Sequence, residues 1–212
     1  MQLPETIKQL PEECLIISYD FEANQTPFIP GCTMSIGAFA IWWTRNLPPI
    51  VRDTFFWTME TKVPMTAESR SWWKNHPQAL EWSLETHGHT SDMAFWQFLK
   101  WIENLDKGAG SARNFPIVLL AQPHDYDAQH IVSNFSSDYI QNSEVYRKIY
   151  PKLHLADCAE LYATQHNLPP EEGKAEFKRR FMPKHLLHHP TFDSMAQLNA
   201  TLTGLLHQRL AS

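Results

Sequence analysis

Short apolar segments, separated by turn-forming residues, constrain the fold of this chain more than any other feature of its sequence. Residues 14–19 (CLIISY) form an apolar run that ends at an acidic residue. A run of this length is typical of a buried β-strand. Residues 34–43 and 54–58 are apolar in the same way. Residues 24–33 contain two prolines and a glycine, so we expect them to connect the first two strands. We therefore predict three consecutive strands near the start of the chain.

Apolar residues with helical spacing follow these strands. Residues 65–85 include Pro77, which predicts a break between two helical segments because proline lacks a backbone N–H. Thr90 or Ser91 is expected to cap the next helix, whose apolar positions recur every three or four residues. These positions are Phe95, Phe98, Leu99, Ile102 and Leu105.

Alternation of strand and helix is predicted for the rest of the chain. Residues 116–121 and 153–156 are expected to form buried strands, each followed by a helix. Residues 169–173 are expected to form a loop, and residues 191–210 a final helix. This order indicates an α/β fold, in which a mixed β-sheet is flanked by helices on both sides. A length of 212 residues fits one such domain, spanning residues 1–212.

Charge and cysteine content narrow the functional classes. A net charge of −5 argues against a protein that coats nucleic acid by charge alone, since such proteins are basic. Three cysteines without a CxxC pair suggest neither a disulfide framework nor a zinc ribbon. We see no leader segment and no apolar run near the ~18 residues of a membrane span, so we expect a cytoplasmic protein without a membrane partner. A homodimer is left open.

Two acidic residues, separated by one position, follow the first predicted strand. Asp20 and Glu22 are expected to point to the same side, because residues i and i+2 of a strand share a face. Two carboxylates so close repel one another unless a cation lies between them, which makes the pair a candidate metal site. Strand ends also carry acids simply because they meet solvent, and this alternative is open for the pair taken alone.

Two later segments add acidic residues in comparable positions. Asp127 follows the predicted strand at 116–121, and the nearby Asp125 competes for the same role. His188 and Asp193 form an H-x4-D pattern at the start of the last predicted helix. Acids at a helix start can instead cap the helix or interact with its dipole, and exposed histidines are common. Each of these signals is therefore weak by itself.

The order of these signals along the chain is more specific than any one of them. D-x-E on the first strand, an aspartate after a later strand and H-x4-D at the last helix resemble the DEDDh 3′→5′ exonucleases of the ribonuclease H-like superfamily. The segments SWWKNHPQAL and VLLAQPHDYDAQHI resemble a bacterial and phage branch that includes the mycobacterial RNase AS type. Departures from the usual residues of this branch occur at Gln122, Pro123, Tyr126, Pro190 and Thr191, and none of them removes a carboxylate.

This resemblance implies a ribonuclease H-like mixed sheet and a two-metal mechanism. Two Mg²⁺ or Mn²⁺ ions would be held by Asp20, Glu22, Asp127 and Asp193, because hard cations prefer oxygen ligands. His188 would act as general base, a role that suits histidine because its pKa lies near neutrality. The expected activity is hydrolysis of single-stranded DNA or RNA from the 3′ end, with release of 5′-mononucleotides.

Contacts to the substrate backbone are expected from two segments. By resemblance, the backbone of Ala23, Asn24 and Gln25 would hold the terminal nucleotide. The basic segment at residues 174–184 is a candidate to bind phosphates upstream of the scissile bond. A solvated helix face explains the same basic segment equally well.

Contacts to the bases are expected from aromatic rings. Trp72, Trp73 and Phe28 are candidates, because stacking on a ring requires no particular base. Packing in the hydrophobic core is at least as good an explanation for any one of them. DNA and RNA both stay open as substrates, since the contacts that discriminate them go to the 2′-hydroxyl.

Two rival functions are also open. His87 and His89 form H-x-H, and His185, His188 and His189 form a cluster, so a zinc hydrolase is an alternative. No H-E-x-x-H motif accompanies these histidines. A degenerate nuclease fold that only binds nucleic acid is the second alternative, although degenerate members usually lose acids that are all present here.

Overall fold

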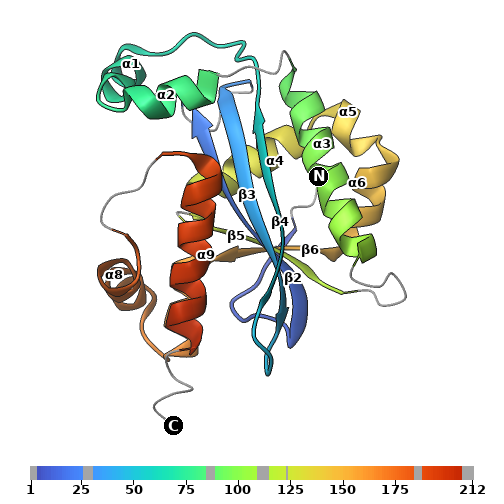
Figure 1. The fold of residues 1–212 in the computed structure, drawn as a ribbon, viewed down its shortest axis with the longest axis vertical. Helices are drawn as coiled ribbons and strands as arrows, with labels where there is room; N and C mark the ends of the chain where they lie inside the picture. The colour runs from blue at the N-terminus through green and yellow to red at the C-terminus, as the bar shows by residue number, and fades with distance from the viewer. Residues whose placement is uncertain are drawn as a thin grey trace.

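The computed structural model describes residues 4–25, 31–84, 89–108, 115–122, 124–183 and 188–206, without the side chains of residues 124 and 125. Within these ranges, six strands form one sheet in the order β1-β6-β5-β2-β3-β4. The strands are β1 (Glu5–Thr6), β2 (Glu13–Ala23), β3 (Thr33–Thr44), β4 (Ile50–Thr58), β5 (Ile117–Ala121) and β6 (Leu153–Asp157). Figure 1 shows this twisted sheet at the centre of the molecule.

The sheet is mixed, as the sequence predicts. β2, β3 and β4 pair in antiparallel order, which confirms the three expected N-terminal strands. β5 pairs in parallel with β2 and β6, and β1 pairs in parallel with β6. β5 and β6 confirm the strands expected at 116–121 and 153–156, whereas the two-residue β1 was not predicted. The α/β class is therefore confirmed.

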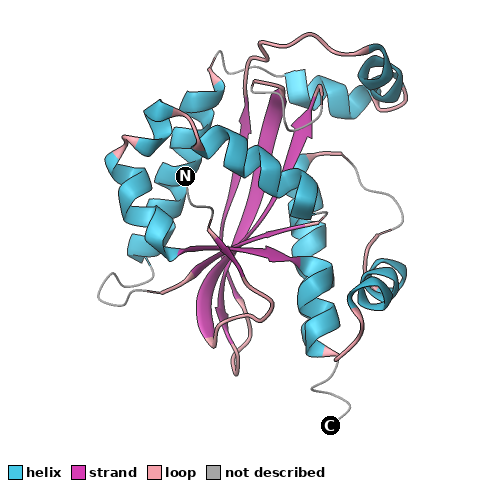
Figure 2. Ribbon diagram, turned by 180° about the vertical axis from the view of Figure 1, so that it is seen from behind, coloured by secondary structure: helices cyan, strands magenta, loops and turns pink. Residues whose placement is uncertain are grey.

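Helices cover both faces of the sheet, as Figure 2 shows from behind. They are α1 (Ala67–Lys74), α2 (Pro77–Leu84), α3 (Ser91–Gly108), α4 (His124–Phe135), α5 (Asp138–Gln141), α6 (Glu144–Ile149), the 3-10 helix η1 (Tyr150–Lys152), α7 (Cys158–Gln165), α8 (Pro170–Arg180) and α9 (Pro190–Leu206). α3 to α6 pack on one face, and α7 and α9 pack on the other, with α8 against α7. None of the helices in the described ranges is long and apolar enough to cross a membrane.

Side chains of β2 alternate between the two hydrophobic cores of the molecule. Ile17 and Tyr19 belong to the core beneath α3 and α4, whereas Ile16 belongs to the core beneath α7 and α9. Asp20 and Glu22 share the parity of Ile16. The two acids therefore leave the strand on the face that α9 covers.

Several helix boundaries agree with their sequence signals. Pro77 is the first residue of α2, so the predicted break in the segment 65–85 is confirmed. The hydroxyl of Thr90 accepts a hydrogen bond from the backbone N–H of Met93 at 3.4 Å, as expected for a cap. The final helix starts at Pro190, one residue before the predicted start, and its described part ends at Leu206.

The predicted loop at residues 169–173 is wrong. α8 begins at Pro170, because proline is tolerated in the first turn, where its missing N–H would have no partner. Gly173 then lies against α7, and a Cβ at this glycine would stand 2.2 Å from the Cβ of Ala163. The glycine that suggested a loop therefore permits close contact between two helices. The short helices α5 and α6 were also not predicted.

Candidate metal centre

Four carboxylates from three separate elements lie around one pocket. Asp20 and Glu22 come from the end of β2, Asp127 from near the start of α4, and Asp193 from the first turn of α9. His188, just before α9, lines the same pocket, whose volume is about 490 Å³. The fold thus brings together five residues from three distant parts of the sequence.

The topology of the sheet explains this convergence. β2 and β5 are parallel neighbours, so their carboxyl ends meet at one edge, where open α/β sheets commonly bind ligands. A register shift between Glu22 and Ala23 lies at this edge, and such bulges redirect side chains near functional sites. α4 follows β5 and brings Asp127 to the same edge. The acids therefore occupy a position where the architecture favours a site.

Hydrogen bonds from β2 and α9 orient Asp127 and Asp20. The backbone N–H of Phe21 donates to Oδ1 of Asp127 at 3.3 Å, and the side-chain amide of Gln197 donates to Oδ1 of Asp20 at 3.1 Å. Asp127 is only 1% exposed, and its Oδ2 has no hydrogen-bond partner among the described residues. Burial of such an oxygen without a partner is costly, so this atom favours a ligand from outside the protein.

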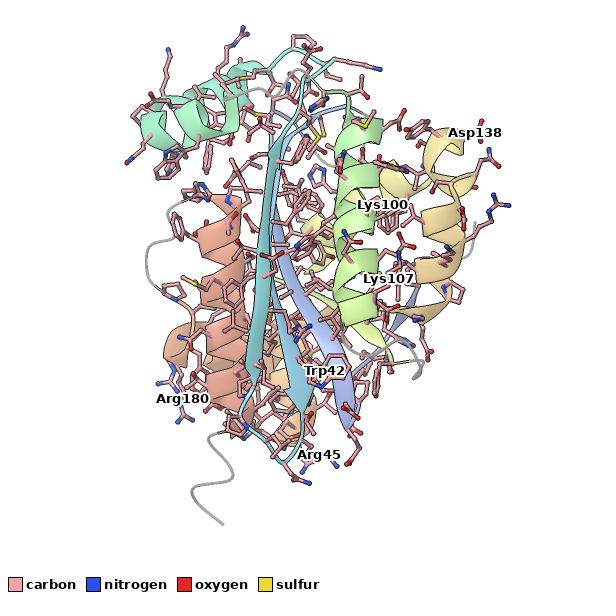
Figure 3. The ribbon with its side chains drawn as sticks, turned by 45° about the vertical axis from the view of Figure 1, so that its right-hand side comes forward. Trp42, Arg45, Lys100, Lys107, Asp138 and Arg180 are labelled. Atoms are coloured by element: carbon pink, nitrogen blue, oxygen red, sulfur yellow. The ribbon has the colours of Figure 1, made fainter. Side chains whose placement is uncertain are left out.

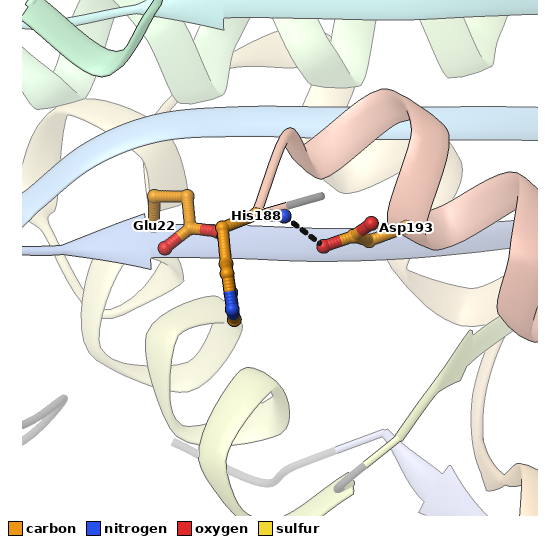
Figure 4. A group of neighbouring side chains, drawn as sticks. All are labelled: Glu22, His188 and Asp193. Atoms are coloured by element: carbon orange, nitrogen blue, oxygen red, sulfur yellow. Dashed lines mark hydrogen bonds and ion pairs between the residues drawn. The ribbon is translucent and has the colours of Figure 1, made fainter. Parts of the chain in front are cut away.

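His188 lies between Glu22 and Asp193, as Figure 4 shows. Its backbone N–H donates to Oδ2 of Asp193 at 2.8 Å, and its ring Nδ1 lies 3.9 Å from Oε1 of Glu22. The backbone of His188 is in the left-handed region, with φ of 55°. Each of the three residues presents one ligand atom, and these atoms lie within 4.8 Å of one another. Asp193 therefore anchors the main chain that carries the histidine ring to the acids.

Burial and mutual repulsion raise the pKa of the acidic side chains. The pKa of Asp20 is raised well above 3.8, first by burial and then by the charges of Asp127, Glu22 and Asp193. Burial, followed by Asp193 and Asp127, raises the pKa of Glu22, and burial raises the pKa of Asp127. None of the described residues that line the pocket is a lysine or an arginine. This oxygen-rich set fits hard divalent cations.

The pKa of His188 is shifted in the opposite direction. It is lowered from 6.5, first by burial and then by the nearby His76. A lowered pKa means that the neutral imidazole predominates at neutral pH. His188 is therefore in the form that can accept a proton.

The raised carboxyl pKa values predict how stability of the metal-free protein changes with pH. Below 3.8 for Asp20 and 4.5 for Glu22, these groups are protonated in both the folded and the unfolded chain. As pH rises above these values, the unfolded chain ionises while the folded site keeps its protons, so their contribution to the free energy of unfolding falls. Asp20→Asn should therefore gain stability relative to the parent as pH rises. Melting temperatures of both proteins in EDTA across a pH series measure this, and a difference that does not vary with pH would contradict it.

Gly37 permits the start of α9 to approach the sheet beside the acids. This residue of β3 pairs with Asp20 of β2. A Cβ at Gly37 would lie 2.1 Å from the backbone nitrogen of Thr191 and 2.4 Å from the carbonyl carbon of Pro190. The hydroxyl of Thr191 also donates to the backbone oxygen of Phe55 at 3.1 Å. The first turn of α9, which carries Asp193, is thus in direct contact with the backbone of β3.

Gly37→Ala should therefore displace α9 and destabilise the fold. The clash is with backbone atoms, which cannot turn aside, so we expect a loss of about 1–3 kcal/mol or more in the free energy of unfolding. Urea denaturation measures the loss. Gly108→Ala is the matched control, because its Cβ would meet only the flexible end of Arg52, at 3.1 Å. If Gly108→Ala loses as much free energy of unfolding as Gly37→Ala, the contact with α9 is not the cause of the loss.

The segment after the D-x-E motif makes contacts that the sequence did not predict. Ala23 and Gln25 line the pocket, whereas Asn24 is 2% exposed. The side-chain amide of Asn24 donates to the backbone oxygen of Val63, and that of Gln25 donates to the backbone oxygen of Pro64 at 2.5 Å. These two amides connect β2 to the loop that leads into α1. Binding of the terminal nucleotide by the backbone of this segment stays a prediction.

The two tryptophans of α1 differ in exposure. Trp72 is 38% exposed and lines the pocket, so part of its ring is available to a substrate. Trp73 also reaches the pocket wall, but it is 2% exposed and packs with Met34 and Ala79. Trp73 therefore packs mainly in the core, which was the alternative considered for both rings. Trp72 is better placed to stack on a base of the substrate.

Other predicted contact residues lie outside the pocket or outside the described ranges. Residues without a described side chain are Phe28, His87, Pro123, Asp125, Lys184 and His185. In α8, Lys174 pairs with Glu171, and Arg180 pairs with Glu176. Figure 3 shows Arg180 beside the lower part of α9, away from α1 and α2. The basic segment therefore does not line the pocket within the described residues.

Two residues that line the pocket, and one that supports it, were not predicted as site residues from the sequence. Gln122 and Tyr126 line the pocket, and Gln197 supports Asp20 from α9. Gln197 follows Asp193 by four positions, and residues at this spacing share a helix face. That spacing is the signal that could have identified it. Gln122 is 6% exposed, and its Oε1 has no hydrogen-bond partner among the described residues.

Comparison with known proteins gives a structural likeness alone. No protein-family model matches the sequence, and no curated protein is significantly similar to it. The fold is similar to the zinc-bound form of E. coli exonuclease I in complex with single-stranded DNA, with a TM-score of 0.54 and 13% sequence identity over 94% of this chain and 41% of that chain. A second exonuclease I structure gives a TM-score of 0.53 and 13% identity, covering 92% of this chain and 41% of the other.

This likeness confirms the predicted ribonuclease H-like fold. The chain matches 41% of the length of the solved exonuclease chains. At 13% identity the likeness concerns the fold and not the chemistry. The resemblance to the branch with the mycobacterial RNase AS type stays a prediction.

Proposed function

We propose that this chain is a metal-dependent 3′→5′ exonuclease that acts on single-stranded nucleic acid. The observation that carries the proposal is the convergence of Asp20, Glu22, Asp127 and Asp193 with His188 around one pocket. The fold supports it, because a solved exonuclease bound to single-stranded DNA has a similar architecture. The pocket volume of about 490 Å³ also lies within the roughly 300–1,000 Å³ that is usual for ligand sites.

The donor set fits two Mg²⁺ or Mn²⁺ ions. The four carboxylates would be the ligands, and the buried Oδ2 of Asp127, which has no hydrogen-bond partner among the described residues, would gain one. Bound cations would lower the pKa of the attacking water and neutralise charge on the phosphoryl oxygens. Opposite charge would also favour the ionised carboxylates and offset the repulsion that raises their pKa.

The other side chains at the pocket would position the reactants and move the proton. His188, neutral because its pKa is lowered, would accept the proton of the attacking water. Gln197 and the backbone N–H of Phe21 would keep Asp20 and Asp127 oriented. Trp72 would stack on a base without selecting its identity.

The chemistry defines the product. The water oxygen forms a bond to phosphorus, and the bond between phosphorus and the 3′-oxygen of the preceding nucleotide breaks. The phosphate therefore leaves on the 5′ side of the terminal nucleotide, and the shortened strand ends in a new 3′-hydroxyl. Repetition of this step releases 5′-mononucleotides one by one.

The decisive experiment uses single strands of DNA and of RNA, labelled at the 5′ or the 3′ end. With Mg²⁺ or Mn²⁺, a 5′-labelled strand should shorten stepwise, and a 3′-labelled strand should release labelled 5′-mononucleotide at once. EDTA or a 3′-phosphate should block both reactions. Efficient cutting of a circular single strand would refute the exonuclease assignment.

A zinc hydrolase is the second candidate, because Glu22, His188 and Asp193 could together ligate one ion. In that case His188 is a ligand and not a base. Zinc content after purification without chelator distinguishes the two candidates, as does the metal-induced rise in melting temperature of His188→Ala. Retention of that rise favours the exonuclease, and its loss favours the zinc site.

A further inference from the structure

Two stacked rings from the junction of α1 and α2 contact the side chain of His188. Trp72 and His76 stack with ring centroids 4.1 Å apart and an interplanar angle of 26°. The ring of His188 stands nearly perpendicular to both, at 4.8 Å from Trp72 and 4.6 Å from His76. One face of Trp72 is thus covered by His76, and the two rings form a cradle for the histidine. We use "ring cradle" below for Trp72 and His76 together.

The ring cradle is itself held in place by hydrogen bonds. Nδ1 of His76 lies 3.0 Å from the backbone oxygen of Trp72, which can only accept, so Nδ1 carries the proton in this contact. The backbone N–H of His76 donates to the oxygen of Trp73 at 3.0 Å. α2 begins at the next residue, Pro77, and Trp73 is buried. Rotation of the His76 ring would therefore break its hydrogen bond to Trp72. The backbone of His76 is fixed as well, by its own hydrogen bond and by the start of α2.

The ring cradle is also connected to the strand that carries the acids. The side-chain amides of Asn24 and Gln25, which directly follow β2, donate hydrogen bonds to the backbone oxygens of Val63 and Pro64. The hydroxyl of Thr66 then accepts from the N–H of Ser69 and caps α1. The position of α1, and of the rings it contributes, is in this way tied to β2.

The ring of His188 needs such support. Its backbone N–H is bonded to Asp193, which holds the main chain but leaves rotation about the side-chain bonds open. A side chain on such a residue, partly exposed, can otherwise occupy several staggered rotamers. Aromatic pairs favour edge-to-face contacts such as those that His188 makes with Trp72 and with His76. The contact selects the rotamer that directs Nδ1 toward Glu22, at 3.9 Å.

We propose that His76, together with Trp72, is a positioning residue that holds the ring of His188 at the acidic cluster. The proposal rests on the proposed function, in which His188 is the general base. His76 is not among the described residues that line the pocket, and its ring contacts that of His188, so it acts through His188. Its removal should therefore slow the chemical step and leave substrate binding nearly unchanged.

Three variants test the kinetic part. His76→Ala removes the ring, His76→Phe keeps a ring of similar shape, and Asn75→Ala changes the neighbouring residue at the same junction without touching either ring. We expect kcat to fall about tenfold in His76→Ala, with KM within twofold of the parent. His76→Phe should recover most of kcat, and Asn75→Ala should match the parent. The rise in melting temperature with Mg²⁺ should persist in all three.

Proton NMR of the metal-free protein tests the ring contact without any activity. The carbon-bound imidazole protons of His188, assigned by their loss in His188→Ala, should be shifted by ring currents from the cradle. The shift should diminish in His76→Ala and persist in His76→Phe. Unmoved His188 signals, or an unchanged kcat, in a folded His76→Ala would overturn the proposal.

Other outcomes are equally informative. A rise in KM alone would assign His76 to substrate binding and would overturn the positioning role. A His76→Phe variant that is as slow as His76→Ala, although its ring still shifts the His188 signals, would also overturn that role. A parent that degrades no strand would refute the proposed function and, with it, the catalytic half of this inference. The NMR comparison would then still decide whether the ring cradle holds His188.

Discussion

Asp20→Asn should abolish metal-dependent cleavage, with a loss of at least about 10³-fold in kcat. Burial raises the pKa of Asp20 most, and the charges of Asp127, Glu22 and Asp193 raise it further, so this side chain is repelled by each of the other acids. The amide keeps the shape of the side chain but removes the charge that would hold a cation. Because repulsion among the acids falls, the melting temperature in EDTA should stay level or rise. Cleavage rates and melting curves with and without Mg²⁺ measure both effects.

The control for this variant is Asp138→Asn, an exposed acid at the start of α5 on the opposite face of the sheet. It should match the parent in rate, and Mg²⁺ should raise the melting temperature of the parent and the control but not of Asp20→Asn. The amide variants of Glu22, Asp127 and Asp193 should behave like Asp20→Asn. An active Asp127→Asn beside an inactive Asp125→Asn would show that the third acid is wrongly assigned.

His188→Ala should lose roughly 10²–10⁴-fold in rate, the usual contribution of a positioned general base. Its proposed role is proton transfer, so the metal-induced rise in melting temperature should be retained. In the parent, the rate should increase as pH rises through the pKa of the imidazole. Burial and His76 lower that pKa below 6.5, so the increase should be complete at lower pH than for a free histidine. Rates measured at several pH values and one metal concentration test this increase with pH, which should be absent in His188→Ala.

His189 and His185 serve as neighbours for comparison with His188. The ring of His189 stacks on Phe56 at 4.7 Å and is not among the described residues that line the pocket, so His189→Ala should be mild. The spacing of H-x4-D predicts a mild effect at His185 as well. An inactive His189→Ala beside a nearly normal His188→Ala would place the general base one residue later.

The parts of the site on β2 were the most accessible to sequence reasoning. The i, i+2 spacing of Asp20 and Glu22 sufficed to predict a shared face, because strand geometry alternates with a fixed period. The break at Pro77 and the cap at Thr90 follow from equally local rules. Asp127 and Asp193 required the order of motifs along the chain, since nothing in their own neighbourhoods distinguishes them from helix-capping acids.

Features that depend on contacts between distant segments could not be predicted in this way. Gly173 resembles a loop residue in the sequence, and only the approach of Ala163 explains it as part of a helix. The burial of Trp73 depends on Met34, and the amide bond from Asn24 depends on the path of the loop at Val63. Each of these roles is defined by a partner whose position the sequence pattern does not specify.

Phe21 links the hydrophobic core to the acidic cluster through a single residue. Its ring packs against Phe95 and against His130 of α4, at centroid distances of 5.6 and 5.2 Å, while its backbone N–H holds Asp127 on the same helix. A change of volume at this core position would rotate or shift α4 and would carry Asp127 with it. Stability and the geometry of the proposed metal site are therefore not separable traits here. If the proposed function holds, sequence drift in the core beneath α4 is restricted by the chemistry on the other side of the strand.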